Sequence, residues 1–115
     1  MKNVNGESFE IRREENNSTV TFKGALRLSG TADYAPILEM LRETFITTAK
    51  PIVLDLRELD FLNSSGITML SRFIIEARDC AGIEVEILAS EAIPWHARSL
   101  KNLQRLMPAL NIRLV

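Results

Sequence analysis

Segments that favour strands alternate with segments that favour amphipathic helices along most of this chain, and no other feature constrains its fold as much. After two N-terminal strand-like segments, the expected elements are a helix over 33–48, a strand over 51–56, a helix over 64–81, a strand over 83–88, a helix over 94–107 and a strand over 111–115. Strand–helix–strand units pair their strands in parallel through right-handed crossovers. The sequence therefore predicts an α/β fold.

The polarity of the last two strands indicates which faces of the sheet are covered. Glu84 and Glu86 alternate with apolar residues, and Arg113 lies between Ile112 and Leu114. A parallel sheet with helices on both faces has nearly continuous apolar strands. We therefore expect helices mainly on one face of the sheet, with the other face in contact with water.

The N-terminal segment predicts a β-hairpin. Apolar and polar residues alternate over 9–15 and again over 18–24, and the polar pair Asn16–Asn17 separates the two segments. Strands joined by a short polar turn pair antiparallel, so the sheet would be mixed. In the helix that follows, Asp33 is expected to be the N-cap, which places Pro36 in the first turn, where proline is tolerated.

Length and composition bound the possible functions. A chain of 115 residues, 46% of them apolar, predicts one folded domain over residues 1–115. Because the net charge is −1, no overall positive charge attracts the chain to nucleic acid, and we expect no nucleic-acid partner. The N-terminus lacks the apolar core of a signal peptide, and no apolar run approaches the roughly 20 residues of a membrane span. We therefore expect a cytoplasmic protein without membrane insertion. Cys80 and His96 are the single cysteine and histidine, too few for a zinc site.

The segment LDFLNSSGITML, residues 59–70, places two serines and a glycine between a strand and a helix. The longer segment LDLRELDFLNSSG is expected to form the loop from the strand into this helix. Loops at the carboxyl ends of strands carry the functional groups of many α/β domains. Asn63 or Ser64 can cap the helix, and Gly66 allows a close approach of the backbone. From the residue types alone, the segment is either a capping turn or a functional surface.

Helical periodicity divides the segment 64–79 into two faces. The spacing predicts a buried face of Ile67, Leu70, Phe73, Ile74 and Ala77, and an outer face of Ser64, Thr68, Arg72, Ile75 and Asp79. Ile75 is the large apolar member of the outer face. An apolar residue on the same face as a serine at a helix N-terminus suggests a docking surface whose edge can be modified.

The segment IVLDLRELDFLNSSGITMLSRFI, residues 52–74, resembles the signature segment of STAS domains, specifically that of the anti-sigma-factor antagonists of bacterial partner-switching systems. That family shows a buried strand, a short loop, Asp-Ser-Ser-Gly and a helix rich in Leu and Ile. The order of the expected elements is also similar over nearly the whole chain. The resemblance implies a STAS-like βα superhelix with an N-terminal β-hairpin and a mixed sheet.

The same resemblance implies a regulatory switch protein without catalytic activity or cofactor. In the family, a partner that is both serine kinase and anti-sigma factor binds the unphosphorylated protein and phosphorylates its serine, and a serine phosphatase reverses the modification. The corresponding acceptor here is Ser64, with Ser65 as the less favoured position. The surface expected to bind the partner comprises Asn63, Ser64, Thr68, Arg72 and Ile75.

Two positions depart from the family pattern. Asn63 stands where the family has Asp, so the helix cap is kept but the carboxylate that could orient the acceptor hydroxyl is absent. Arg27 stands where an acidic residue often follows the second strand. These departures suggest a divergent subgroup.

An alternative of another class is a STAS-like ligand-sensing module that binds a nucleotide or another small molecule and is not phosphorylated. Catalysis is not expected, because the only histidine is His96 and the sequence has neither a G-x-S-x-G motif nor a glycine-rich phosphate-binding loop. His96 is expected to pack in the buried stripe of the last helix. Trp95 fits the edge of the core and an interface equally well. The oligomeric state is left open.

Charged residues near the ends of the elements complete the set of candidates. Arg98, Lys101 and Arg105 form a basic stripe on the last helix, which is either a solvated face or an electrostatic rim for an acidic partner. Asp55 is expected to end a strand, and Asp55 or Asp60 could accept a hydrogen bond from a loop N–H.

Overall fold

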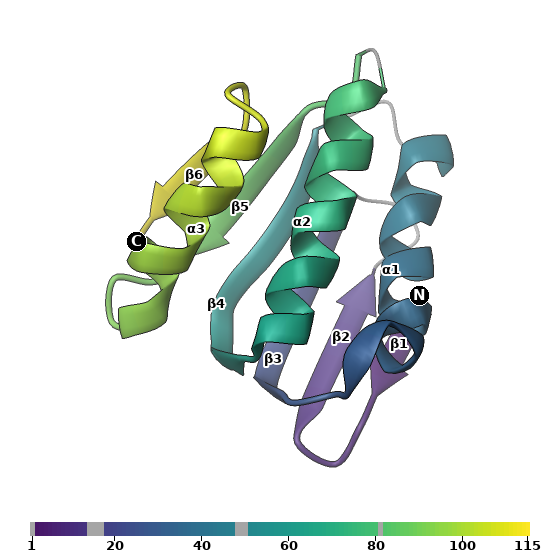
Figure 1. Ribbon diagram of the computed structural model, residues 1–115, viewed down its shortest axis with the longest axis vertical. Coiled ribbons are helices and arrows are strands. Elements are labelled where there is room, and N and C mark those ends of the chain that lie inside the picture. Colours follow the sequence, from purple (N-terminus) through teal and green to yellow (C-terminus); the bar gives the residue numbers. More distant parts are fainter. Residues whose placement is uncertain (1, 14–17, 48–50, 81) are drawn as a thin grey trace.

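We describe a computed structural model of the chain, which covers residues 2–13, 18–47, 51–80 and 82–115. In these residues six strands form one mixed sheet, and three helices lie together over one of its faces (Figure 1). The elements are, in chain order, β1 (Lys2–Asn5), β2 (Phe9–Arg13), β3 (Thr19–Leu26), α1 (Gly30–Thr47), β4 (Ile52–Leu62), α2 (Ser64–Asp79), β5 (Val85–Ala89), α3 (Pro94–Leu106) and β6 (Asn111–Leu114). The predicted α/β fold with helices on one face is confirmed.

The strands lie in the sheet in the order of the sequence, from β1 to β6. The neighbours β1, β2 and β3 pair antiparallel, and β3 to β6 pair in parallel, each parallel pair being connected by one helix. The carboxyl ends of the parallel strands therefore share one edge of the sheet, where all three helices begin. The junction between β4 and α2, which carries the candidate serines, lies at this edge.

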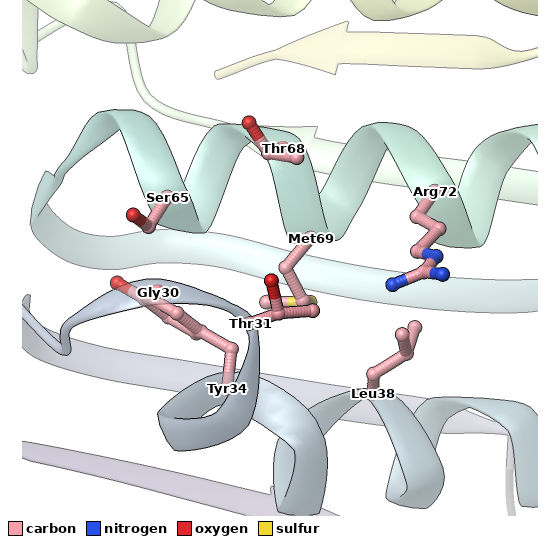
Figure 2. Close-up of a pocket in the computed structure, with 8 residues that line it drawn as sticks. All are labelled: Gly30, Thr31, Tyr34, Leu38, Ser65, Thr68, Met69 and Arg72. Carbon is pink, nitrogen blue, oxygen red and sulfur yellow. The ribbon is translucent and has the colours of Figure 1, made fainter.

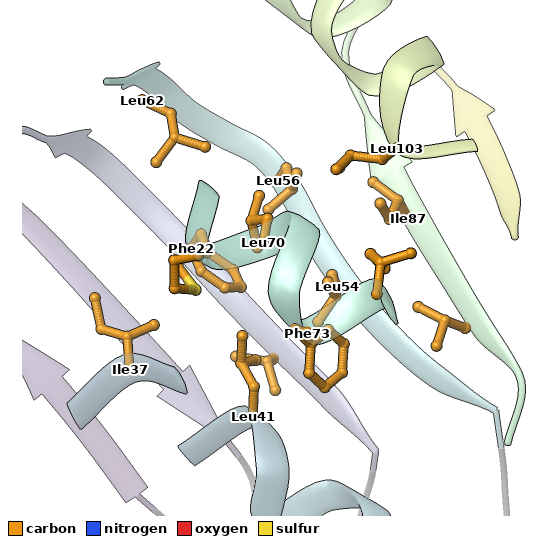
Figure 3. Close-up of a cluster of buried hydrophobic side chains, with 14 of the residues drawn as sticks. Phe22, Ile37, Leu41, Leu54, Leu56, Leu62, Leu70, Phe73, Ile87 and Leu103 are labelled. Carbon is orange, nitrogen blue, oxygen red and sulfur yellow. The ribbon is translucent and has the colours of Figure 1, made fainter. Parts of the chain in front are cut away.

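The core fills the space between the sheet and the helices (Figure 3). Except in the second half of β4, most alternate residues of the central strands are buried, and these side chains meet the inner faces of α1, α2 and α3. Residues with almost no exposed surface include Phe22, Ile37, Leu41, Leu54, Leu56, Leu70, Phe73, Ile87 and Leu103. Burying one such side chain contributes about 1.5–3 kcal/mol to the free energy of folding. The buried side chains of α2 thus fix the helix against the sheet, independently of any contact made by its outer face.

The other face of the sheet carries ion pairs, as the alternating strands predicted. Lys23 pairs with Glu58 at 3.5 Å, and the guanidinium of Arg57 donates two hydrogen bonds to the Asp55 carboxylate at 2.8 and 2.9 Å. The hydrogen bonds from Arg57 lower the pKa of Asp55. Asp55 also accepts from the backbone N–H of Arg57, but both residues lie within β4, so the expected position of Asp55 at a strand end, beside a loop N–H, is wrong.

Strand β4 is longer than predicted, and the loop expected over LDLRELDFLNSSG is wrong. The strand continues to Leu62, directly before Asn63. Arg57 and Glu58 are both exposed, and the register between β3 and β4 shifts beside them. The register shifts a second time between Leu59 and Phe61, where Asp60 and Phe61 are both exposed. The first extra residue returns Leu59 to the buried face, and the second returns Leu62. Simple alternation fails at such a bulge, so the pattern concealed the second half of the strand.

The start of α1 also differs from the prediction. The helix begins at Gly30, whose positive φ of 67° a glycine adopts without strain. Asp33 is therefore not the N-cap but a residue of the first turn, where its carboxylate accepts the N–H of Ser29 at 3.2 Å. Pro36 consequently falls in the second turn rather than the first.

At the N-terminus the predicted pairing of the hairpin strands is confirmed, with Ile11 opposite Phe22. Its turn at Asn16–Asn17 lies outside the described residues. Strand β1 was not predicted, because Val4 is its only apolar residue and no alternation is visible. Its pairing with β2, which places Val4 opposite Ile11, is a tertiary contact.

Candidate functional site at the start of helix α2

Asn63 caps helix α2 and ties it to the start of α1. Its Oδ1 accepts the N–H of Gly66 at 3.0 Å and the hydroxyl of Tyr34 at 2.6 Å. Its Nδ2 donates to the carbonyl oxygen of Leu28 at 2.8 Å. Because a backbone N–H can only donate, the contact with Gly66 fixes which end of the amide is the oxygen. The capping role predicted for Asn63 is confirmed, and the whole side chain is engaged in it.

The residues around this cap are packed too closely for a larger side chain. Gly66 is buried, and a Cβ at this position would collide with the side chain of Leu62 and lie 2.9 Å from the hydroxyl of Tyr34. Burial raises the pKa of Tyr34, while a hydrogen bond with the Leu28 backbone opposes the shift. The close approach expected at Gly66 is therefore present, and the contact is with the side chains of Leu62 and Tyr34.

The hydroxyls of the two serines take no part in this network. Ser64 is the first residue of α2 and is exposed, whereas Ser65 is half-buried. Among the described residues, neither hydroxyl takes part in a hydrogen bond. The backbone carbonyl of Ser64 accepts the hydroxyl of Thr68 at 3.0 Å. The side chain of Asn63 thus stabilises the junction, and the hydroxyls of Ser64 and Ser65 are available for modification or for contact with a partner.

The two faces predicted for α2 agree with the structure except at their borders. Leu70, Phe73, Ile74 and Ala77 are buried, and so is Met69, which the spacing did not assign. Ile67 is only half-buried. On the outer face, Ser64, Thr68, Arg72 and Asp79 are exposed, but Ile75 is half-buried. Ile75 therefore offers part of its side chain to a partner rather than all of it.

A groove between α1 and α2 runs beside Ser65 (Figure 2). Its volume is about 100 Å³, with Leu38 and Met69 along its length and the side chain of Arg72 at one end. Thr31 and Tyr34 of α1 also line the groove. The sequence pointed to Ser65, Thr68 and Arg72 but not to the α1 residues, since the pairing of two helices leaves no mark in the spacing of either.

The junction between β5 and α3 uses its polar groups differently. His96 is fully buried; its Nδ1 accepts the N–H of Ser90 at 2.9 Å, so Nε2 carries the proton and donates to the carbonyl of Leu59 at 3.0 Å. Burial lowers the pKa of His96, which keeps the ring neutral. The packed role expected for His96 is confirmed. Trp95 is half-buried and donates to the carbonyl of Asp60 at 3.0 Å, which favours the edge of the core.

Further charged groups surround the candidate site. Arg98, Lys101 and Arg105 are exposed and form no ion pair with other described residues. Arg27 lies over the ring of Phe61 at 4.7 Å, and Phe61 is 40% exposed. No group of three or more His, Cys, Asp or Glu in the described ranges is arranged to hold a metal ion. None of the described helices combines the length and apolar character that crossing a membrane requires.

Comparisons with known proteins place this fold. No family model matches the sequence, and no curated protein matches it either. A chain in the crystal structure of diguanylate cyclase SiaD in complex with its activator SiaC from Pseudomonas aeruginosa superposes with a TM-score of 0.78 at 12% identity, covering 100% of both chains. Apo-SiaC from the same organism superposes with a TM-score of 0.72 at 13% identity, covering 99% of this chain and 98% of SiaC.

The chain has the fold of SiaC. The STAS-like fold predicted from residues 52–74 is therefore confirmed over the full length of the chain. At 12–13% identity the likeness concerns the fold and not the identity of any site residue.

Proposed function

We propose that this protein is a non-catalytic regulator that binds a signalling partner through the outer face of α2, and that phosphorylation of Ser64 weakens this binding. The observation that carries the proposal is the division of labour at the β4–α2 junction. Asn63 takes over the capping, and the hydroxyl of Ser64 is exposed and makes no hydrogen bond with the described residues. Because the hydroxyl of Ser64 makes no contact that stabilises the fold, its modification should cost the domain little stability.

The position of Ser64 also suits a phosphate physically. The first N–H groups of a helix have no partner within the helix, and Asn63 satisfies that of Gly66. A phosphate of charge about −1.5 to −2 is accommodated by the remaining N–H groups and by the helix dipole. Phosphorylation can therefore change the charge of the docking surface without unfolding the domain. Ser65 is the second candidate acceptor, but it is half-buried.

The resemblance to anti-sigma-factor antagonists supports a partner of the serine kinase or anti-sigma type and a serine phosphatase that reverses the modification. The structural likeness supports a second class of partner, because SiaC is the activator of the diguanylate cyclase SiaD. In both cases the protein acts by binding, and the outer-face residues Thr68, Arg72 and Ile75 surround Ser64 as contacts.

A ligand-sensing function at the groove beside Ser65 has less support. The groove beside Ser65 has a volume of about 100 Å³, whereas pockets for small molecules are about 300–1,000 Å³. A nucleotide would not be enclosed there. The two functions separate in a thermal-unfolding experiment: a nucleotide sensor is stabilised by nucleotides, and a binding regulator is not.

The test is affinity capture from the native cell with wild type, Ser64→Ala and Ser64→Asp as baits. Asn102→Asp is the matched control, because it adds the same charge at an exposed position of α3. We expect wild type, Ser64→Ala and Asn102→Asp to capture the same kinase-like or cyclase partner, and Ser64→Asp to bind it about tenfold more weakly, a change of about 1.4 kcal/mol.

Mass spectrometry of the recovered bait shows whether Ser64 or Ser65 carries phosphate. Equal capture by Ser64→Asp and wild type, with neither serine ever modified, would contradict the proposal and leave the two serines as parts of a capping turn.

A further inference from the structure

The groove between α1 and α2 combines an apolar interior with polar walls. Leu38, Met69 and the buried Tyr34 supply apolar surface, and the side chains of Thr31 and Ser65 stand at its sides (Figure 2). The groove has space for one aliphatic side chain, since a volume of about 100 Å³ is well below that of a metabolite site. Its two walls are helices, so it is a surface against which another helix can lie.

Arg72 at the end of this groove makes no direct ion pair with the described residues. Glu76 lies one turn further along α2, but both of its oxygens bind Arg42 of α1, at 2.8 and 2.7 Å. Glu39 binds the same Arg42 at 2.6 Å. Among the described residues, Arg72 forms no ion pair, although it is exposed. The hydrogen bonds from Arg42 lower the pKa of Glu76, and the charge of Arg72 adds to this effect, but both oxygens of Glu76 are hydrogen-bonded to Arg42. The hydrogen-bond donors of Arg72 are thus left for a group from outside.

We infer that this groove receives one aliphatic side chain from a helix of the partner, and that an Asp or Glu within one turn of that side chain pairs with Arg72. The inference rests on the proposed binding function and names the chemistry of its partner. Charge complementarity argues for an acidic helix, and the volume of the groove argues for a single anchoring side chain.

The same geometry relates docking to modification. Ser65 lines the groove, and Ser64 precedes it in the chain. A phosphate on either serine adds negative charge at the edge of the surface that receives the partner's carboxylate. Repulsion between the phosphate and the negative charge of the partner weakens docking.

The first test uses isocaproate, a carboxylate attached to an aliphatic chain like that of leucine. The probe is titrated into the purified protein while the backbone amide shifts are followed by NMR. We expect shifts confined to the groove residues of α1 and α2, with a dissociation constant on the order of 10 mM for a ligand of this size.

Three variants make this test specific. Thr31→Trp fills the groove from an exposed position of α1 and should abolish the shifts. Arg72→Glu should weaken binding at least about fivefold. Arg98→Glu is the matched control, because it reverses the charge of another exposed arginine without an ion pair, on α3, and should leave binding unchanged. No shifts in the groove, or equal weakening by Arg72→Glu and Arg98→Glu, would overturn the inference.

The second test uses the partner identified by the capture experiment. Thr31→Trp and Arg72→Glu should reduce its binding about tenfold, and Arg98→Glu should not. If Ser64→Asp weakens binding while both groove variants bind like wild type, the groove inference fails and the proposed switch stands. If the groove variants weaken binding while Ser64→Asp does not, the switch fails and the groove inference stands.

Discussion

Two of the three strand-to-helix junctions at the same edge of the sheet, β4–α2 and β5–α3, use their polar residues in opposite ways. At the β5–α3 junction, both ring nitrogens of His96 and the indole N–H of Trp95 are hydrogen-bonded to backbone groups of neighbouring segments. At the β4–α2 junction Asn63 is bonded to the backbone of Leu28 and Gly66 and to the hydroxyl of Tyr34, whereas the hydroxyls of Ser64 and Ser65 make no hydrogen bond among the described residues. The polar side chains of the β5–α3 junction therefore stabilise the fold. At the β4–α2 junction only the inner side chain, Asn63, does so, and the serine hydroxyls on the outer side are not hydrogen-bonded.

The difference shows how a functional surface is recognised when no catalytic group is present. Polar side chains whose bonds are all satisfied within the fold cannot be changed without a cost in stability. Polar side chains that lie at a helix start and bond to nothing can be modified at little cost. The free hydroxyls, rather than the conspicuous histidine and tryptophan, therefore mark the candidate site.

The largest expected effect concerns what anchors α2. Leu70 is 1% exposed and lies between α2 and the sheet. Leu70→Ala should lower the free energy of unfolding by about 2–5 kcal/mol, because it leaves a cavity in the core. The measurement is urea-induced unfolding, with Ser64→Ala as the control, for which we expect a change within about 0.5 kcal/mol. Similar losses in both variants would show that the outer side of the junction is structural after all.

A smaller effect separates the inner and outer sides of the β4–α2 junction. In Asn63→Asp, a carboxylate oxygen replaces the amide that donates to the Leu28 carbonyl, so this carbonyl loses its donor. We expect the free energy of unfolding to fall by about 1–3 kcal/mol. Ser64→Asp adds the same charge one residue later, at an exposed helix start, and should not destabilise the protein. Equal unfolding midpoints for the two variants would remove the distinction between the two sides.

The smallest expected effect is a pH dependence of the free energy of unfolding, which arises from His96 at the β5–α3 junction. Burial lowers the pKa of His96 below its ordinary value of 6.5, so the unfolded chain takes up this proton more readily than the folded one. The contribution of His96 to stability is present above pH 6.5 and is lost as the pH falls from there toward the folded pKa. Urea unfolding at pH values on both sides of 6.5 should show this decline. The decline should be smaller in His96→Gln, and an equal decline in both proteins would contradict the assignment.

Much of the candidate site could be predicted because its signals are local. A cap depends on a few consecutive residues, so NSSG alone predicted that Asn63 or Ser64 caps the helix, and Asn63 is the cap in the structure. The buried face of α2 follows from helical spacing, which requires no knowledge of the partner elements. The alternation of Glu84 and Glu86 with apolar residues likewise revealed that one face of the sheet is open.

What the sequence did not reveal depends on contacts between distant segments. The second half of β4 was missed because two bulges, at Arg57–Glu58 and at Asp60–Phe61, break the alternation, and only pairing with β3 shows that the strand continues. The groove was missed because Tyr34 and Leu38 of α1 reach Ser65 and Met69 of α2 only when the two helices pack together.

The sequence by itself determined the α/β class, the single layer of helices and the position of the serines at a helix start. Periodicity and capping fix these features within one element at a time. Only the tertiary structure decided which polar groups are already bound and which are free. Asn63 is hydrogen-bonded to Leu28, and Trp95 to Asp60, each across 35 residues. The hydroxyl of Ser64, in contrast, makes no hydrogen bond with the described residues. Whether a hydroxyl or an arginine is available to a partner depends on every segment folded around it, and that information is not contained in the spacing of any one of them.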